Sequence, residues 1–451
     1  MSSIATAGPV RTVRLLSLPA AAGVRAARGT VRRLTGAEPD LVREETRRAN
    51  AAHARRVLGE LKGGALKAGQ LLSTVEMLFP ADPEQSWREA LVALQEGNRG
   101  LPFREVEPVL VAELGRDWRS RFREFDQDAT AAASLGQVHR AVWADGRTVA
   151  VKVQYPAVRE ALASDLRAVS VATRLAALVA RGMTLPPLVA ELRTRLVEEL
   201  DYVREGATQA TFAAAFEGDP DVEVPEVVEA RSRVLVSTWL DGTPLARLAG
   251  ADAATRDRAG LLYQRFLLSG PERAGILHTD PHPGNFRLTG GGRLGVLDFG
   301  SALRMPDGMP PTFGRLITVL LSGDPAEVER GLREERFVRP GVSVDARKLV
   351  DYLAPFSEPA RHEVFTYSRE WLRSQFGRLG DPRDPDFAVA LRLDLPAEHL
   401  FTHRVWLGVV GVLSQLGATV PVRSELRRWL PGFTPAGSPT SAGVTESDDV
   451  S

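Results

Sequence analysis

The sequence predicts an α+β fold with two lobes, a small lobe that contains β-strands and a larger helical lobe. Three observations lead to this prediction. The chain has 451 residues, more than a single hydrophobic core usually organises. Alternating apolar residues at 136–143 and 148–154 flank an Asp-Gly turn, which is the pattern of a β-hairpin. From residue 312 to residue 430 the apolar spacing is mostly helical, with breaks at Pro and Gly.

Composition narrows the class of protein. The 57 basic and 57 acidic residues cancel, so no overall field attracts nucleic acid, and we expect no nucleic-acid partner. The absence of cysteine excludes disulfides and thiolate catalysis and fits a reducing cytoplasm. The apolar stretch at 405–418 is shorter than the roughly 20 residues that span a bilayer, so we expect a buried helix there.

Both ends of the chain have the composition of disordered segments. Residues 1–36 contain no Asp or Glu and carry Arg11, Arg14, Arg25, Arg28, Arg32 and Arg33. This basic arm is expected to be solvated, with contact to anionic lipid as the alternative. A weak signal-peptide pattern within it is interrupted by Pro19 and Gly23. Residues 431–451 are rich in Gly, Ser, Thr and Pro and are expected to be disordered.

Residues 37–100 are expected to form a helical extension. Apolar residues recur at helical spacing from Leu58 to Phe79, and Pro80 follows. Lys67 and Gln70 lie three residues apart and therefore share one face of this helix. A helical lysine is usually solvated, but the small residues between these two permit close packing against another element. After this extension, residues 101–125 are predicted to form a pair of helices.

The segment from His278 to Gly300 carries the most specific chemistry. It places Asp280, Asn285 and Asp298 on two turns, joined by short strands around a Thr-Gly-Gly-Gly-Arg turn. One carboxylate, Asp280, can orient a nucleophile, while Asn285 and Asp298 can hold Mg²⁺ against nucleotide phosphates. The Asp-x-x-x-x-Asn spacing followed by Asp-Phe-Gly matches the catalytic and metal loops of protein kinases. Either piece alone is weak, whereas the ordered pair is specific.

A histidine metal site is the alternative for this segment, because His278 and His282 flank Asp280. Zinc would require further His or Cys ligands nearby. The chain has no cysteine and no other histidine between His282 and His362, so the magnesium interpretation is favoured.

The predicted hairpin supplies a lysine of the kind that grips phosphates. Lys152 follows Val-Ala-Val in the second strand, the position of the nucleotide-binding lysine in kinase folds. Such a lysine needs a glutamate to hold it, and we choose Glu205 from the helical pattern at 158–205. The alternatives are an exposed strand lysine and a merely soluble acidic helix.

Two further segments are predicted to contact the nucleotide. An alanine-rich loop replaces the glycine-rich loop of protein kinases, and its methyl groups should change how the phosphates bind; its residues are Ala131, Ala132, Ala133, Ser134 and Gly136. The hinge between the lobes, at 237–240, is expected to face adenine through Ser237 and Trp239. After Gly300 there is no Ala-Pro-Glu signature, so the platform that binds a peptide is expected to be missing.

Taken together, these motifs resemble the UbiB/AarF/ADCK family of atypical kinase-like proteins. The resemblance covers about 58–300 in family order: the K-x-G-Q motif at Lys67–Gln70, the alanine-rich loop, Val-Ala-Val-Lys at Lys152, the E-x-D motif at Glu199 and Asp201, His-Thr-Asp-Pro-His-Pro-Gly-Asn, and Asp-Phe-Gly. It implies a protein-kinase-like fold with an N-lobe at 101–242 and a C-lobe at 243–430. The helical extension would pack over the active site, where Lys67 and Gln70 would meet Glu199 and Asp201.

The resemblance also implies function. It implies ATP and Mg²⁺ as cofactors, and ATPase or small-molecule kinase activity ahead of protein phosphorylation. Its association is with isoprenoid quinone biosynthesis or lipid homeostasis, with a quinone or polyprenyl lipid as partner. The transmembrane pair that ends some bacterial members has no counterpart in this sequence. We therefore expect a cytoplasmic protein, and any membrane attachment would have to be peripheral.

Three other functions stay open at this point. The chain could be a nucleotide-binding scaffold with negligible turnover, or a protein kinase held inactive by its N-terminal helix. An enzyme like the aminoglycoside phosphotransferases would share the H-x-D-x-x-x-x-N loop, but it would leave the K-x-G-Q helix unexplained.

Overall fold

The computed structural model describes residues 100–133, 135–156, 158–160, 190, 194, 197–376, 389 and 392–435. The basic arm and the helical extension with Lys67 and Gln70 lie outside the described residues. Ser134, most of the segment expected to be helical at 158–205, and the tail beyond residue 435 lie outside them as well.

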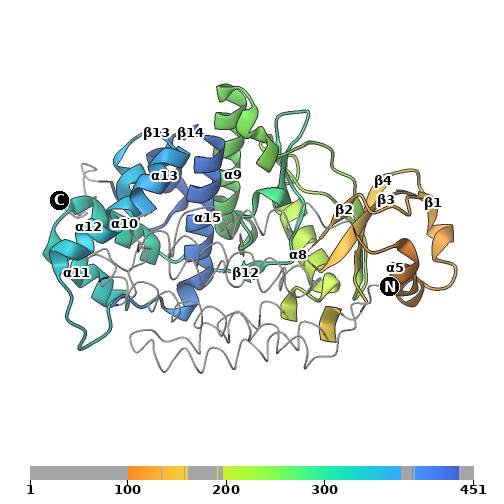
Figure 1. The fold of residues 1–451 in the computed structure, drawn as a ribbon, viewed down its shortest axis with the longest axis horizontal. Helices are drawn as coiled ribbons and strands as arrows, with labels where there is room; N and C mark the ends of the chain where they lie inside the picture. The colour runs from red at the N-terminus through yellow and green to blue at the C-terminus, as the bar shows by residue number, and fades with distance from the viewer. Residues whose placement is uncertain are drawn as a thin grey trace, which may run out of the picture.

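The chain forms a small lobe built on a β-sheet and a larger helical lobe, which confirms the predicted fold class (Figure 1). The small lobe, or N-lobe, contains α5 (Phe103–Leu114), the 3₁₀ turn η1 (Trp118–Arg121), β1 (Phe122–Phe125), β2 (Ala131–Ala132), β3 (Gly136–Trp143), β4 (Thr148–Gln154), α8 (Tyr202–Ala215), β6 (Val227–Ala230) and β7 (Val234–Thr238). Its sheet has the order β1-β3-β4-β7-β6, and β2 pairs with β3.

The alternation of side chains along β4 decides which groups enter the N-lobe core. Val149, Val151 and Val153 are buried and belong to one hydrophobic cluster with residues of α5. Because neighbouring side chains of a strand point to opposite faces, Lys152 lies on the face away from this cluster. Lys152 pairs in register with Val138 of β3 and Leu235 of β7, so it sits in the middle of the sheet.

The prediction of two helices at 101–125 is wrong in its second half. Only α5 is an α-helix, and η1 and β1 follow it. The cause is aromatic packing: the ring centroids of Trp118 and Phe125 are 5.0 Å apart, and those of Phe122 and Phe125 are 5.3 Å apart. Burying these rings against the sheet outweighs the helical spacing of the sequence.

The helical pattern expected up to Glu205 is also divided differently. A turn at 199–200 interrupts it, and α8 begins at Tyr202. The Asp201 carboxylate accepts hydrogen bonds from the backbone N–H groups of Val203 at 3.1 Å and Arg204 at 3.4 Å. Asp is among the preferred N-cap residues because its side chain satisfies such otherwise unpaired N–H groups.

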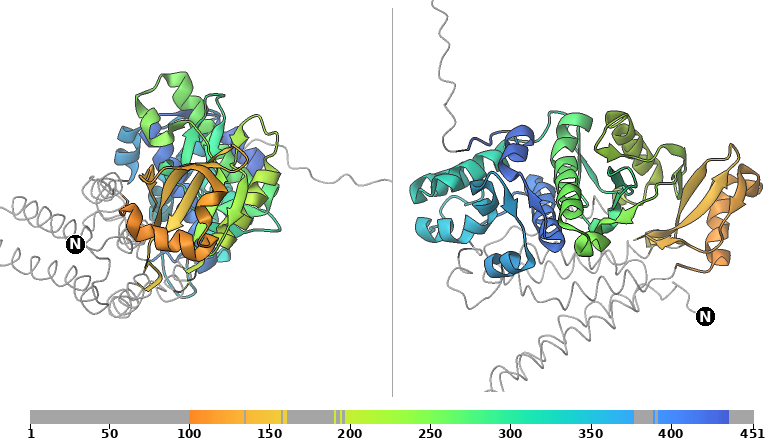
Figure 2. Two further views of the ribbon diagram at one scale, coloured as in Figure 1. Left: turned by 90° about the vertical axis from the view of Figure 1, so that its right-hand side faces the viewer. Right: turned by 90° about the horizontal axis from the view of Figure 1, so that it is seen from above.

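The larger lobe, or C-lobe, is built around two long helices. Its elements are β5 (Val222–Glu223), β8 (Thr243–Pro244), η2 (Leu245–Gly250), α9 (Ala253–Ala274), β9 (Ile276–His278), η3 (Pro283–Asn285), β10 (Phe286–Leu288), β11 (Leu294–Val296), β12 (Ala302–Arg304), α10 (Thr312–Ser322), α11 (Pro325–Glu334), α12 (Ala346–Ser357), η4 (Glu358–Arg361), β13 (Phe365–Thr366), α13 (Arg369–Phe376), η5 (Ala397–His399), α15 (Leu400–Leu416), β14 (Thr419–Val420) and α16 (Val422–Trp429). Figure 2 shows α9 and α15 between the sheet-bearing lobe and the helices α10 to α12.

Helix α15 contains residues 405–416 of the apolar stretch 405–418 and buries most of them, as the sequence predicts. Val409, Val410 and Leu413 of this helix join one hydrophobic cluster with Leu262 and Phe266 of α9. Within the part of the chain that the structure describes, no helix is both long and apolar enough to span a bilayer.

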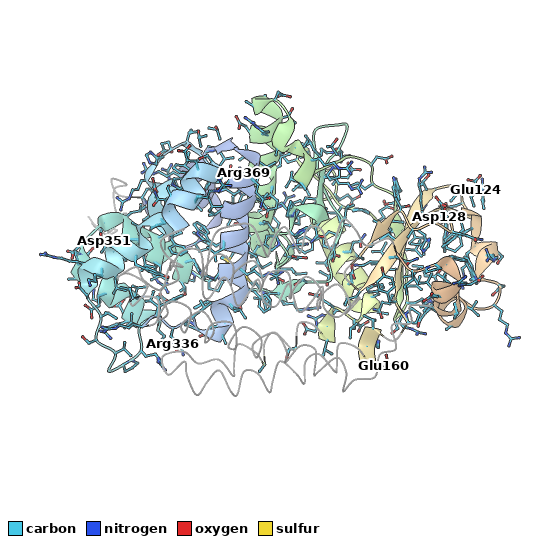
Figure 3. The ribbon with its side chains drawn as sticks, viewed as in Figure 1. Glu124, Asp128, Glu160, Arg336, Asp351 and Arg369 are labelled. Atoms are coloured by element: carbon cyan, nitrogen blue, oxygen red, sulfur yellow. The ribbon has the colours of Figure 1, made fainter. Side chains whose placement is uncertain are left out.

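The expected hairpin after the catalytic segment is present as β10 and β11, which pair in antiparallel register. With β5 and β8 they form a four-stranded sheet at the start of the C-lobe. Charged side chains lie on the outside of both lobes, as Glu124 and Asp128 show at one end of the molecule and Arg336 and Asp351 at the other (Figure 3).

A buried histidine connects the start of the described chain to the sheet. His139 of β3 is fully buried, and its Nδ1 lies 2.9 Å from the Asp126 carbonyl oxygen, to which it donates. Its Nε2 therefore accepts the hydrogen bond from Gln137 Nε2, at 2.9 Å. Gln137 Oε1 in turn accepts the backbone N–H of Leu101 at 2.7 Å. Burial lowers the pKa of His139 below its usual 6.5, against the raising effect of the Asp126 carbonyl.

This network predicts acid sensitivity. In the unfolded chain His139 takes up a proton near pH 6.5, whereas the folded state resists that proton because its pKa is lowered. The free energy of unfolding should therefore fall as the pH drops below about 6.5. His139→Gln should lose less stability between pH 7 and pH 5 in urea unfolding. The exposed His362 provides the control, since His362→Gln should keep the wild-type loss; equal losses in both variants would contradict the assignment.

Candidate active site

The catalytic segment is held by the strand before it and the turn after it. His278 ends the buried strand β9, and η3 begins at Pro283. The His282 imidazole caps this turn by accepting the backbone N–H of Gly284 at 3.1 Å. Asn285 then donates from Nδ2 to Asp280 Oδ2 at 2.8 Å. This hydrogen bond closes the loop between Asp280 and Asn285. It places the Asn285 amide beside the carboxylate that the sequence predicts to orient a nucleophile.

Hydrogen bonds hold the Asp-Phe-Gly turn next to the catalytic segment. Asp298 Oδ1 accepts the backbone N–H of Gly300 at 2.9 Å, and the Phe299 ring is buried in the C-lobe core. His278 Nε2 donates to the Asp298 carbonyl oxygen at 2.6 Å. Because a carbonyl can only accept, this contact fixes the proton of His278 on Nε2. The His278 side chain, two residues before Asp280, is therefore hydrogen-bonded to the main chain of the loop that carries Asp298.

Lys152 brings the N-lobe to these loops. Its Nζ lies 2.7 Å from Glu205 Oε1 and 3.2 Å from Asp298 Oδ2. The side chain of Glu205 is 2% exposed and that of Lys152 is 16% exposed, so water screens this pair little. Burial alone would lower the pKa of Lys152, but the carboxylates of Asp298 and Glu205 raise it well above its ordinary value. Lys152 is therefore a permanent cation, and the pairing expected with Glu205 is observed.

The donor set fits a magnesium ion. The Asn285 amide nitrogen donates to Asp280, which leaves the amide oxygen as an acceptor, and the Asp298 carboxylate is 29% exposed. Hard cations prefer such oxygen ligands, and Mg²⁺ usually takes only one or two protein carboxylates and completes its shell with water and phosphate. Among the residues that the structure describes, no group of three or more His, Cys, Asp and Glu side chains forms a complete protein cage.

The histidine alternative finds no support in the geometry. His278 uses Nε2 to bind the Asp298 carbonyl, and His282 uses Nδ1 to accept the Gly284 N–H. They position the two loops instead of sharing a metal ion.

Arg404 belongs to the site, and the sequence analysis missed it. Its Nη2 lies 3.1 Å from Asp280 Oδ1, and it comes from α15 in the C-lobe. The side chain is 15% exposed and that of Asp280 is 16% exposed. The available signal was the charge itself, since Arg404 directly precedes the apolar stretch that was interpreted only as a buried helix.

The alanine-rich loop is a tight turn between two strands. Ala131 and Ala132 form β2, and Ala133 N–H donates to the Gly136 carbonyl at 2.9 Å. Gly136 itself lies in β3, where a Cβ would come within 2.2 Å of the Val153 carbonyl oxygen. Glycine at this position is thus required by the neighbouring strand, and Ala133 lies closer to the tip of the turn. The site role of these residues stays a prediction.

The hinge residues Ser237 and Trp239 make more contacts within the chain than the sequence predicts. Ser237 lies in β7, in register with Ala150 of β4. Trp239 donates its backbone N–H to the Thr148 carbonyl at 2.9 Å and its indole N–H to Asp241 Oδ1 at 2.8 Å. Both donors of Trp239 are therefore used within the protein. Contact between adenine and Ser237 or Trp239 remains a prediction.

The E-x-D residues lie at the start of α8. Asp201 caps this helix and Glu199 is half-buried in the preceding turn. Lys67 and Gln70, their expected partners, are outside the described residues, so this contact stays a prediction.

The Lys152 and Glu205 pair generates a stability prediction. Lys152→Met leaves the Glu205 carboxylate buried without its cation, which should cost about 3–5 kcal/mol of unfolding free energy in a urea titration. Adding Glu205→Gln removes the buried charge, so the double variant should recover most of that loss. A double variant that loses as much as the sum of the two single variants would contradict the pairing.

Comparisons with known proteins place this chain in a family. The model of the ABC1 atypical kinase-like domain matches residues 93–331. The mitochondrial atypical kinase COQ8 of Saccharomyces cerevisiae is 29% identical over 376 residues, which are 80% of this chain and 72% of that protein. The mitochondrial atypical kinase coq-8 of Caenorhabditis elegans is 31% identical over 388 residues, which are 82% of this chain and 50% of that protein. The chain thus spans between half and three quarters of these two relatives.

A solved structure is also similar. Rv3197 of Mycobacterium tuberculosis, whose structure is a complex with erythromycin, is 36% identical with a TM-score of 0.65. The similarity covers 88% of this chain and 99% of the Rv3197 chain. Because the ABC1 model matches more than half of the 451 residues, and because the kinase-like fold carries the motifs that resemble this family, the chain belongs to the ABC1 atypical kinase-like family, which is also named UbiB, AarF or ADCK.

Proposed function

We propose that this protein binds MgATP and acts as an ATPase or as a kinase of a small molecule or lipid. The observation that carries the proposal is the Lys152 ammonium, held by Glu205 at 2.7 Å and Asp298 at 3.2 Å. A lysine held between these two carboxylates is the arrangement that grips nucleotide phosphates in kinases. The kinase-like family supports the same assignment.

Each residue then has a chemical role. Lys152 binds the phosphates that are not transferred, while Asn285 and Asp298 would hold Mg²⁺. The ion, when bound, neutralises charge that develops on the phosphate oxygens. Asp280 orients the hydroxyl group or water that attacks, and Asn285 keeps its carboxylate in place through the 2.8 Å hydrogen bond. Most of the rate enhancement in such a site comes from positioning and electrostatics.

The proposed partner is a quinone or polyprenyl lipid, in support of isoprenoid quinone biosynthesis or lipid homeostasis at a membrane surface. The COQ8 relatives favour this class. A phosphoryl acceptor must carry a free hydroxyl group that can attack the terminal phosphate, so kinase activity would require a small molecule or lipid of that kind. A peptide acceptor is disfavoured by the short connection between β12, which ends at Arg304, and α10, which begins at Thr312. Closure of the site by Lys67 and Gln70 against Glu199 and Asp201 is part of the proposal.

Nucleotide binding is tested by titrating the protein with mant-ATP, with and without Mg²⁺. The wild type should bind more tightly with Mg²⁺. Asp298→Asn should weaken the magnesium-dependent affinity by about 10- to 100-fold, because a charged ligand is replaced by a neutral one. Asp307→Asn is the matched control, since Asp307 is exposed and lies outside the site. Absence of binding, or binding indifferent to Asp298→Asn, would remove the proposal.

Turnover separates an enzyme from a scaffold. ATP hydrolysis should rise when vesicles containing a quinone-like phenol or a polyprenyl lipid are added, and Asp280→Asn should abolish it. Binding of ATP without any hydrolysis under these conditions would favour the nucleotide-binding scaffold. Phosphate transfer to generic protein substrates would favour a protein kinase.

A second candidate ligand follows from the similar structure. Rv3197 binds erythromycin, and its whole chain aligns with this one at 36% identity. A macrolide-like lactone is therefore a candidate substrate or effector. Erythromycin should raise the thermal midpoint of this protein if it binds the folded state. An unchanged midpoint at millimolar erythromycin would exclude this candidate.

A further inference from the structure

Residues 278–285, which carry Asp280 and Asn285, contain no lysine or arginine. The sequence from His278 to Asn285 is His-Thr-Asp-Pro-His-Pro-Gly-Asn. Both histidines are engaged within the protein, because His278 donates to the Asp298 carbonyl and His282 accepts the Gly284 N–H. The terminal phosphate of a nucleotide is strongly anionic, and phosphoryl transfer depends on cations placed around it. Lys152 is engaged by Glu205 and Asp298 on the N-lobe side. Apart from the magnesium ion of the proposed function, a protein cation on the side of Asp280 would therefore come from another element.

Arg404 of α15 supplies such a cation. Its Nη2 lies 3.1 Å from Asp280 Oδ1, and this is the hydrogen bond that the structure gives it within the described residues. A guanidinium has five N–H donors in a planar fork, so most of its donors stay available. At 15% exposure the group is only partly in contact with water, which strengthens its attraction for an anion.

The close packing of α15 against the catalytic segment fixes the position of Arg404. Gly408 lies one helical turn after Arg404 and therefore on the same face. A Cβ at Gly408 would come within 2.2 Å of Pro281 Cγ, so only glycine lets the helix approach the catalytic segment this closely. From the other side, the Tyr263 hydroxyl of α9 donates to the Pro281 carbonyl at 2.5 Å. Two helices thus clamp the residue next to Asp280.

We propose that Arg404 binds the terminal phosphate of the nucleotide and positions it near the attacking group that Asp280 orients. The family model matches residues 93–331, so this group comes from outside the matched region. The inference rests on the proposed function, because it requires that the site binds ATP. Arg404 would then act as a phosphate-binding residue in addition to orienting the Asp280 carboxylate.

The test compares two nucleotides that differ only in the terminal phosphate. Dissociation constants for MgADP and for the non-hydrolysable analogue MgAMPPNP are measured by calorimetry for the full chain and for Arg404→Ala. The variant should lose about 10- to 100-fold in AMPPNP affinity, the usual range for a hydrogen bond to a charged group. Its ADP affinity should stay within about two-fold, since the remaining phosphates do not need Arg404. Arg404→Lys should keep part of the preference for AMPPNP.

The control is Arg315→Ala, which removes an exposed arginine of α10 that pairs with Glu335. It should leave both affinities unchanged. Equal loss of ADP and AMPPNP binding in Arg404→Ala, or no loss of either, would overturn the inference while leaving the proposed function intact. Failure of the wild type to bind either nucleotide would instead remove the proposed function. The two failures are therefore distinguishable.

Gly408→Ala provides a second variant in case Arg404→Ala does not fold. The added methyl group pushes α15 away from Pro281 and displaces Arg404 while its charge is kept. It should weaken AMPPNP binding several-fold and leave ADP binding unchanged. An unchanged AMPPNP affinity, with thermal unfolding showing an intact fold, would contradict the role given to this helix.

Discussion

The structure of the site depends on keeping one ammonium charge, that of Lys152, between two carboxylates inside the protein. A buried charge without a partner costs several kcal/mol, so each of these groups requires the others. Glu205 is 53 residues away from Lys152 in sequence and Asp298 is 146 residues away. The contact thus draws together a strand of the N-lobe, helix α8 and the loop after β11. This ionic contact adds to the apolar packing between the lobes, in which Leu400 and Phe401 of α15 join the hydrophobic cluster of the N-lobe.

The loops around the Lys152 charge are held mostly by local hydrogen bonds, which restrict their conformations. His278 ties its strand to the Asp298 carbonyl, and Asn285 ties its amide to Asp280. Each of these contacts lies on a short loop whose ends are fixed by paired strands. Positioning by such rigid supports suits phosphoryl transfer, in which the protein contributes placement and charge more than covalent chemistry.

Much of this arrangement could be predicted from the sequence, because its signals are local. The spacing of Asp280, Asn285 and Asp298 fixes three side chains on neighbouring turns, and the alternation around Lys152 fixes its strand. Other features depend on tertiary contacts that a sequence pattern does not contain. Arg404 meets Asp280 across 124 residues, from a helix whose apolar pattern indicates only burial. Likewise, the spacing at 118–125 predicts a helix, but the aromatic rings of this segment pack against the sheet and no α-helix forms there.

The hydrogen bonds of Gln137 have a mechanical consequence. Gln137 Oε1 accepts the Leu101 N–H at 2.7 Å, and its Nε2 donates to the Leu101 carbonyl at 3.2 Å. Leu101 is thereby latched to the second residue of β3, directly beside the alanine turn. Tension arriving along the chain from residue 100 would be delivered to that turn without first passing through α5. The latch therefore couples residue 100 mechanically to the alanine-rich loop, which is predicted to lie over the nucleotide phosphates.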